Sequence, residues 1–189
     1  MSCDQEIEKY LRSNLSEGRF LHSKRTADTA EKLCMLYGGD PCKGRVAGLL
    51  HDIAREHGND EITRLAGTDG LGISSIESEY PVLLHGRAGA VLAKSEIGID
   101  DEEILDAVRW HTTGKLDMSV LTAVLYVADY IEPGRTHIDN EFRCRIKEMS
   151  LDRLVMEIVR SSIAYCRKKG YSVAEQTFLL YHDLEKKVS

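Results

Sequence analysis

VAGLLHDIA, residues 46–54, sets a histidine and an aspartate, His51 and Asp52, near the end of an otherwise apolar segment. Asp40-Pro41 just before it has the form of a helix start, with Asp as the N-cap and Pro in the first turn. A segment that is apolar on all sides predicts a buried helix. Because a buried ionised carboxylate is costly unless it is paired or bound to a metal, Asp52 needs a strong partner.

Helical periodicity extends from this stretch along most of the chain. Apolar residues recur at i, i+3, i+4 and i+7 within residues 30–37, 104–111 and 151–163. Strand-type alternation between turn residues is hard to find. Three stretches have the form of capping boxes: Ser74–Glu77, Asp100–Glu103 and Ser172–Glu175. We therefore predict an all-α protein of about eight to ten helices, forming one domain over residues 1–189.

Composition limits the class of protein before any motif is considered. The 189 residues carry 25 Lys+Arg and 31 Asp+Glu, for a formal net charge of −6, and 42% are hydrophobic. This is typical of a globular protein with its own core, and the acidic balance disfavours binding to DNA or RNA. The five cysteines are scattered and form no C-x-x-C pair, which indicates reduced thiols in the cytoplasm. We expect neither a signal peptide nor a membrane span.

Asp129 poses the same problem as Asp52. It lies near the end of VLTAVLYVADYI, residues 120–131, which is otherwise almost wholly apolar. Adjacent residues on a helix point about 100° apart, so His51 and Asp52 cannot chelate one ion like an i, i+4 pair. We expect them to line a cavity at the end of their helix, where Asp52 is able to bridge two ions.

Three more histidines belong to the same group of candidates. His85 follows PVLL and precedes small residues that allow close approach of helices. His111 occupies an inward i+7 position, and His22 lies beside an apolar stripe with Arg19 one turn earlier. Five predicted helices thus supply the donors of one candidate site: His22, His51, Asp52, His85, His111 and Asp129.

This donor set indicates divalent cations. Imidazole and carboxylate without thiolate suit iron, manganese or zinc, and they disfavour a structural zinc site. Six donors are too many for one catalytic ion with an open position, but they fit two ions about 3.5–4 Å apart, bridged by a carboxylate and a hydroxide. The natural reaction of such a site is in-line attack of the hydroxide on phosphorus.

Each residue also has a plainer interpretation. A lone core histidine is usually a hydrogen-bonded packing residue, and Asp129 alone is compatible with a buried, hydrogen-bonded acid. A His-Asp pair also arises by chance, and His182-Asp183 is an example. His57, His137 and His182 stand in polar contexts and are interpreted as surface residues. The metal hypothesis therefore depends on the combination of donors and not on any one of them.

Five short motifs follow one another along the chain. They are RxxH at 19–22, GLLHDIA at 48–54, LHG at 84–86, HTTG at 111–114 and ADYIEPGR at 128–135. In this order they resemble the HD superfamily of metal-dependent phosphohydrolases, and in detail the YqeK family of symmetrical bis(5′-nucleosyl)-tetraphosphatases. The resemblance implies an all-α HD-domain helical bundle that hydrolyses diadenosine tetraphosphate to two ADP. It also implies a di-iron centre and a homodimer.

The resemblance further implies roles for individual residues. A first set would hold one ion: His22, His51, Asp52 and Asp129. A second set would hold the other ion: Asp52, His85 and His111. Asp52, as the bridge, and Asp129 would be the catalytic carboxylates, and the attacking group would be a metal-bound hydroxide.

Substrate contacts are implied by the same resemblance. Arg19 and Arg135 match positions that contact nucleotide phosphates, and residues 82–84 would border the nucleotide. Free backbone N–H groups at the start of the last helix suit an anion, whereas a capping box of Ser172 and Glu175 would satisfy them. The full set of implied contacts is Arg19, His22, Asp52, Val82, Leu83, Leu84, His85, Asp129, Arg135, Ser172, Val173, Ala174, Glu175, Gln176 and Thr177.

Other functions stay open at this point. The same scaffold suits a phosphohydrolase for a cyclic dinucleotide, a guanosine polyphosphate or a nucleoside monophosphate. A mixed-valent di-iron oxygenase of the HD type would consume oxygen, and a nucleotide sensor would hold metal without turnover. Arg55 departs from the common HD pattern, because many HD proteins carry a lysine at this position, three residues after the aspartate. Its guanidinium suits phosphate binding and not proton transfer.

Overall fold

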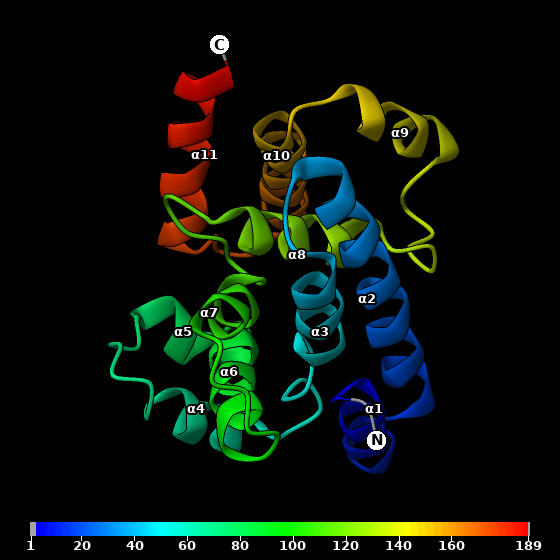
Figure 1. Ribbon diagram of the computed structural model, residues 1–189. Helices are drawn as coiled ribbons and strands as arrows, with labels where there is room; N and C mark the ends of the chain where they lie inside the picture. Colours follow the sequence, from blue (N-terminus) through cyan, green and yellow to red (C-terminus); the bar gives the residue numbers. More distant parts are fainter. Residues whose placement is uncertain (1–2, 189) are drawn as a thin grey trace.

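The structure, a computed structural model, describes residues 3–188, which form helices and no strand (Figure 1). The all-α prediction is confirmed, with eleven α-helices within this range instead of about eight to ten. Together with two short 3-10 helices, η1 and η2, the elements are α1 Cys3–Asn14, α2 Glu17–Tyr37, α3 Pro41–Leu50, α4 Asn59–Ala66, α5 Ser75–Glu79, η1 Pro81–Leu84, α6 His85–Ser95, α7 Glu102–Trp110, α8 Val120–Ile131, α9 Asn140–Arg145, η2 Ile146–Glu148, α10 Leu151–Lys169 and α11 Glu175–Val188.

Helix α3, which ends just before His51 and Asp52, begins as predicted. The side chain of Asp40 accepts hydrogen bonds from the backbone N–H groups of Cys42 and Lys43, at 2.8 and 3.2 Å, and Pro41 follows in the first turn. The helix ends at Leu50, so the His-Asp pair lies just beyond it. Residues 47–54 are all buried, which agrees with their apolar pattern.

The three predicted capping boxes have different outcomes. Ser74–Glu77 forms a reciprocal box at the start of α5. The second prediction is wrong by one residue, because Asp101 and not Asp100 is the N-cap of α7. The third is wrong, because α11 begins only at Glu175 and Ser172 lies in the preceding connection.

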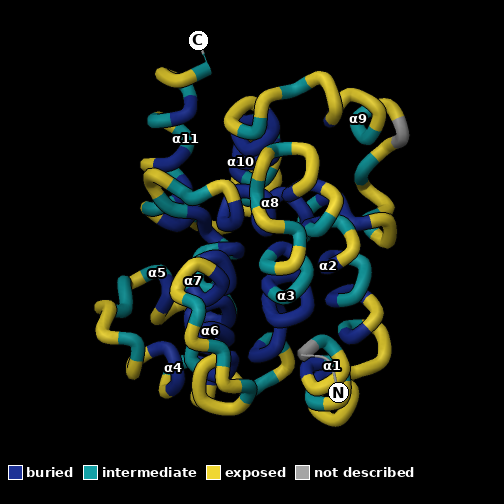
Figure 2. Tube along the Cα trace, viewed as in Figure 1, coloured by how far each residue is buried: buried dark blue, intermediate teal, exposed yellow. Residues whose placement is uncertain are grey.

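Close approach between helices positions the predicted donors. Helix α3 packs against α1, α2, α7 and α8, and Figure 2 shows the buried segments gathered along α3, α6, α7 and α8. A Cβ on Gly48 would lie 2.4 Å from Cα of Ala27 in α2, and one on Gly86 would lie 2.8 Å from the carbonyl oxygen of Arg109 in α7. Only glycine allows these contacts, which join the helix pairs that carry the predicted histidines.

Several simpler predictions can also be compared with the structure. Within residues 3–188 no helix combines the length and the apolar character needed to cross a bilayer. His137 and His182 are exposed, whereas His57 is only partly so. Four cysteines are free thiols: Cys34, Cys42, Cys144 and Cys166.

Candidate metal centre

The six predicted donors converge at one place in the molecule. Helices α2, α3, α6, α7 and α8 bring them together, in the chain order His22, His51 with Asp52, His85, His111 and Asp129. All of them are buried except Asp129, of which 26% of the side chain is exposed. Asp129 is more exposed than Asp52, because this part of α8 faces a hollow of about 170 Å³ that His85 and His111 also line.

The histidines form two pairs. In one pair, Nε2 of His22 lies 3.1 Å from Nε2 of His51 and 3.0 Å from Oδ1 of Asp129. In the other, Nε2 of His85 lies 3.0 Å from Nε2 of His111. Each pair thus presents imidazole nitrogens, and not carbon edges, to its neighbour.

Asp52 lies between the two histidine pairs. Its Oδ1 is 3.2 Å from Nε2 of His85, and its Oδ2 is 3.3 Å from Nε2 of His51 and 3.5 Å from Nε2 of His22. Burial by itself would raise the pKa of Asp52, but His51 and His85 outweigh burial and lower its pKa well below the usual range. Asp52 is therefore an ionised carboxylate with one oxygen directed at each pair.

Hydrogen bonds at Nδ1 establish the tautomer of each histidine. Nδ1 of His51, His85 and His111 lies 2.8, 2.6 and 2.8 Å from the carbonyl oxygen three residues earlier. A carbonyl oxygen only accepts, so Nδ1 carries a hydrogen, and in the neutral imidazole Nε2 then keeps its lone pair. His22 reaches the same state differently, because its Nδ1 lies 3.1 Å from Oε1 of the Glu132 carboxylate.

In the neutral rings these tautomers leave the Nε2 lone pairs facing one another. The hydrogen-bond donors beside them are Oγ1 of Thr112, 3.3 and 3.4 Å from Nε2 of His85 and His111, and Nη2 of Arg135, 3.5 Å from Nε2 of His22. Burial and the neighbouring His85 and His51 lower the pKa of His111 to about 3, so a proton is not available there near neutral pH. Burial also disfavours a charge on His51, but Asp52 outweighs it and raises the pKa of His51. Cations between the Nε2 atoms and the carboxylates would satisfy every donor atom, so the residues fit a metal centre.

Two overlapping triads have ligand atoms within 4.8 Å of one another, one of His22, His51 and Asp129 and one of His51, Asp52 and His111. The first contains three of the four residues expected for one ion. The second contains two of the three expected for the other ion, with His51 in place of His85. His51 is therefore common to both triads in this geometry.

Two arginines border the cluster. Arg19 Nη1 donates to Oδ2 of Asp52 at 2.6 Å. Arg135 donates to a carboxylate oxygen of Asp129 through Nη2, and to its backbone carbonyl through Nε at 2.9 Å. The two arginine side chains are 28% and 34% exposed, so both reach solvent from the cluster. They form a positively charged border beside the donor set.

The sequence reasoning assigned no role to Glu132, which is 2% exposed and supports His22. Its second carboxylate oxygen accepts hydrogen bonds from Nε of Arg25 and from the backbone N–H of Gly134, both at 2.5 Å. A glutamate directly after an apolar helix and before a proline was the available signal. Thr112 also lies beside the cluster, with its Oγ1 3.3 Å from Nε2 of His85.

The segments expected to border a nucleotide are only partly accessible. Val82 and Leu83 are partly exposed, but Leu84 is fully buried, so its side chain offers no surface to a ligand. Thr177 is 8% exposed and donates through Oγ1 to the carbonyl oxygen of Thr113 at 2.8 Å. This bond ties the first turn of α11 to the loop that follows α7, close to the donor cluster.

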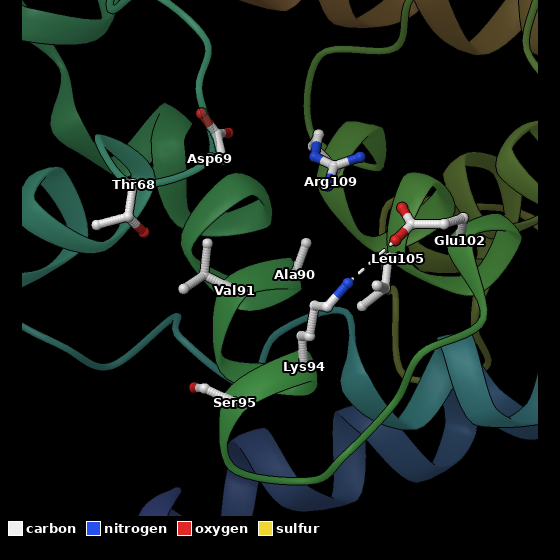
Figure 3. Close-up of a pocket in the computed structure, with 9 residues that line it drawn as sticks. All are labelled: Thr68, Asp69, Ala90, Val91, Lys94, Ser95, Glu102, Leu105 and Arg109. Carbon is white, nitrogen blue, oxygen red and sulfur yellow. Dashed lines mark hydrogen bonds and ion pairs between the residues drawn. The ribbon is translucent and has the colours of Figure 1, made fainter.

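A separate hollow of about 320 Å³ lies beside α6 and α7 (Figure 3). None of the six donors lines it. Its charged groups are largely paired, because Lys94 lies 3.2 Å from Glu102 and Asp69 bonds to Arg87 at 2.8 Å. The donor cluster, and not this hollow, is therefore the candidate site.

Comparison with known proteins places this site in a family. The model of the HD domain matches residues 19–134, which include all six donors. The symmetrical bis(5′-nucleosyl)-tetraphosphatase of Bacillus subtilis is 31% identical, over 91% of this chain and 92% of its own length. The protein of that name from Staphylococcus aureus is 33% identical, over 92% and 90%.

A solved structure supports the same assignment. It is described as a "predicted HD superfamily hydrolase involved in NAD metabolism" from Clostridium acetobutylicum, and it is 36% identical to this chain. The two superpose with a TM-score of 0.91 over 99% of this chain and 98% of the other. The chain thus belongs to the HD domain family, and within it to the family of the symmetrical bis(5′-nucleosyl)-tetraphosphatases.

Proposed function

We propose that this protein is a hydrolase that cuts a dinucleoside tetraphosphate at its central anhydride, so that diadenosine tetraphosphate yields two ADP. The observation that carries the proposal is the convergence of four imidazole Nε2 atoms on the carboxylate of Asp52, at 3.2 to 4.0 Å. Relatives that cover nine-tenths of the chain or more carry the corresponding name.

The six donors are proposed to hold two divalent ions, with Asp52 as the shared ligand and iron as the metal. His22, His51 and Asp129 would serve one ion, and His85 with His111 the other. When bound, such ions would lower the pKa of water and hold phosphoryl oxygens. Asp52 and Asp129 are the proposed catalytic carboxylates, because each lies beside histidine Nε2 atoms and accepts a hydrogen bond from a bordering arginine.

The protein's own cations are proposed to bind the phosphate chain. The guanidinium groups of Arg19 and Arg135 are partly exposed and suit two-pronged hydrogen bonding to phosphate oxygens. Cleavage at the centre requires the site to hold one nucleoside two phosphates away from the attacked phosphorus. The proposed contacts of that nucleoside are Val82, Leu83 and residues 172–177, which end in the first turn of α11.

Three further properties belong to the same proposal. Residues 1–189 form one HD domain, because α10 packs on α8 and α11 packs on α10. The protein acts in the cytoplasm, which the free thiols support. It forms a homodimer, as the family resemblance implies, and it does not act on DNA or RNA.

The test is product analysis by chromatography after the purified protein has been loaded with iron or manganese. Diadenosine tetraphosphate should give ADP as its only nucleotide product, and elemental analysis should find about two ions per chain. ATP with AMP, or no product, would contradict the proposal. A panel with a cyclic dinucleotide, a guanosine polyphosphate and a nucleoside monophosphate identifies a rival activity by its product.

A further inference from the structure

Two hollows lie in succession beside α8 and α10. The inner hollow, of about 170 Å³, reaches the donor cluster and is bordered by His85, His111, Asp129, Tyr130 and Ile158. The outer hollow, of about 270 Å³, is bordered by Tyr130, His137, Asp139, Phe142, Glu157 and Ile158. Tyr130 and Ile158 border both, so the two hollows are direct neighbours, and the outer one lies on the far side of these two residues from the donor cluster.

The walls of the outer hollow are held in place by defined contacts. Tyr130 donates through its hydroxyl to Oγ of Ser161 at 2.9 Å, and its ring meets that of His137 edge to face, with centroids 5.0 Å apart. Arg143 donates to the carbonyl oxygens of Glu132 and Arg135, at 3.2 and 3.1 Å, which secures the connection that leads to His137. The hollow is thus a formed recess next to Tyr130.

The chemistry of the outer hollow suits the uncharged end of a nucleotide better than its phosphates. Tyr130, His137 and Phe142 offer aromatic rings, on which bases stack. Asp139 and Glu157 supply carboxylates: Oδ1 of Asp139 accepts from the backbone N–H of Phe142, and Oε1 of Glu157 accepts from Nε of Arg153. A carboxylate has further lone pairs, so each is able to accept a hydrogen bond from a ribose hydroxyl, and both repel phosphate oxygens. A neutral nucleoside meets both conditions, whereas a free polyphosphate end meets neither.

The geometry points to a second nucleoside subsite in the outer hollow, which takes the nucleoside of the leaving half of a dinucleoside tetraphosphate. The inference rests on the proposed function, because only a substrate with a nucleoside at each end needs two subsites. The first subsite, at residues 82–83, follows α5, whereas His137 and Phe142 belong to the region of α9. Figure 1 shows α5 and α9 on opposite sides of the molecule, so the two subsites belong to different parts of the fold.

The test compares two substrates that differ only in the second nucleoside, diadenosine tetraphosphate and adenosine 5′-tetraphosphate. The ratio of their kcat/KM values measures what the second nucleoside contributes. In His137→Ala this ratio should fall about tenfold from the wild-type value, as expected for the loss of one base stack. His137→Phe, which keeps a stacking ring, should retain most of the ratio. His137 is exposed, so neither substitution threatens folding.

Tyr130→Ala is a second test, because Tyr130 borders both hollows. This substitution should also lower the ratio of the two kcat/KM values. The matched control is Tyr165→Ala, an aromatic on α10 that is 58% exposed and lines neither hollow, and it should leave the ratio unchanged. If the wild type yields two ADP but no variant changes the ratio, the subsite is wrong and the proposed function stands. If the wild type yields no ADP, both fall.

Discussion

Helix α6 contributes to two clusters of buried polar groups that are built in opposite ways. Arg87 is 4% exposed, yet its donors have acceptors. Its Nε and Nη2 donate to the two carboxylate oxygens of Asp69, both at 2.8 Å. Nη1 and Nη2 also meet the carbonyl oxygens of Gly72 and Leu71, both at 2.9 Å. Two residues earlier, His85 directs a lone pair at another lone pair.

The difference separates a structural ion pair from a binding site. At Arg87 the protein supplies the complement of every buried charge, so nothing further is needed. At the donor cluster four imidazoles and two carboxylates face the bordering arginines and one hydroxyl, that of Thr112, so the missing component is positive. Burial of charge alone does not identify a site; burial of charge without its complement does.

The largest expected effect is on stability and comes from the complete cluster. Arg87→Met leaves the carboxylates of Asp69 and Glu77 buried without their partner and should lower the free energy of unfolding by about 3–5 kcal/mol. Urea denaturation measures this value. Metal content per folded chain should not change. Arg64→Met is the control, since Arg64 bonds Glu61 in the same way at an exposed site, and it should change stability little. A stable Arg87→Met protein that loses metal would contradict the assignment.

At the incomplete cluster the largest effect should be on activity. Asp52→Ala removes the carboxylate that faces both histidine pairs and should lower kcat by more than about a hundredfold, because even outer partners of ligands cost up to that amount. Elemental analysis should show less metal at the same time. Asp183→Ala is the matched control, because Asp183 also follows a histidine, His182, but lies on α11 and is not one of the six donors. This variant should keep full activity. Equal effects of the two substitutions would contradict the proposed site.

Glu132 tests the one histidine that a carboxylate orients. Glu132→Gln keeps the size of the side chain but loses the charge that fixes the Nδ1–H tautomer of His22. Metal affinity, measured by titration with a competing chelator, should fall about 10–100-fold. Arg25 bonds the same carboxylate, so Arg25→Lys should give a smaller loss of affinity. An unchanged affinity in Glu132→Gln would show that the tautomer of His22 does not depend on this contact.

The pH dependence of the metal-free protein tests whether His111 is held neutral. Its pKa in the folded protein is about 3, against an ordinary value of 6.5, so between these values the unfolded chain binds more protons. Stability from this group is therefore present above pH 6.5 and is lost as the pH falls toward 3. Thermal unfolding of His111→Gln, which does not titrate, should show a smaller slope with pH. Equal slopes would contradict a neutral His111. A raised pKa of His51 gives the opposite sign and persists in both proteins.

The smallest effect should come from the arginine border. Arg19→Lys keeps the charge but loses the planar pair of donors, so KM should rise about fivefold while the metal content stays the same. Steady-state kinetics with diadenosine tetraphosphate measures the change. Lys9, which is exposed on α1, gives the control substitution Lys9→Ala. A loss of metal in Arg19→Lys would assign Arg19 to the support of Asp52 and not to substrate.

Local patterns accounted for the helical class and for the choice of donors. The apolar surroundings of Asp52 and its place after a capped helix were readable because burial and capping depend on near neighbours in the chain. Local patterns did not predict the structure where the same spacing of residues is compatible with two different structures. Ser172–Glu175 has the spacing of a capping box, but α11 begins at Glu175. Asp129 follows apolar residues, yet it faces a hollow that only the packing of α8 creates.

The amino-acid sequence alone thus established an all-α chain with six metal-type donors and with arginines near two of them. The packed structure established that these donors meet, that their lone pairs oppose one another, and that Glu132 and a recess at Tyr130 belong beside them. The reason is physical. Periodicity and capping act within a few residues, whereas the distance between His22 and His51 depends on how closely Gly48 lets α2 approach α3.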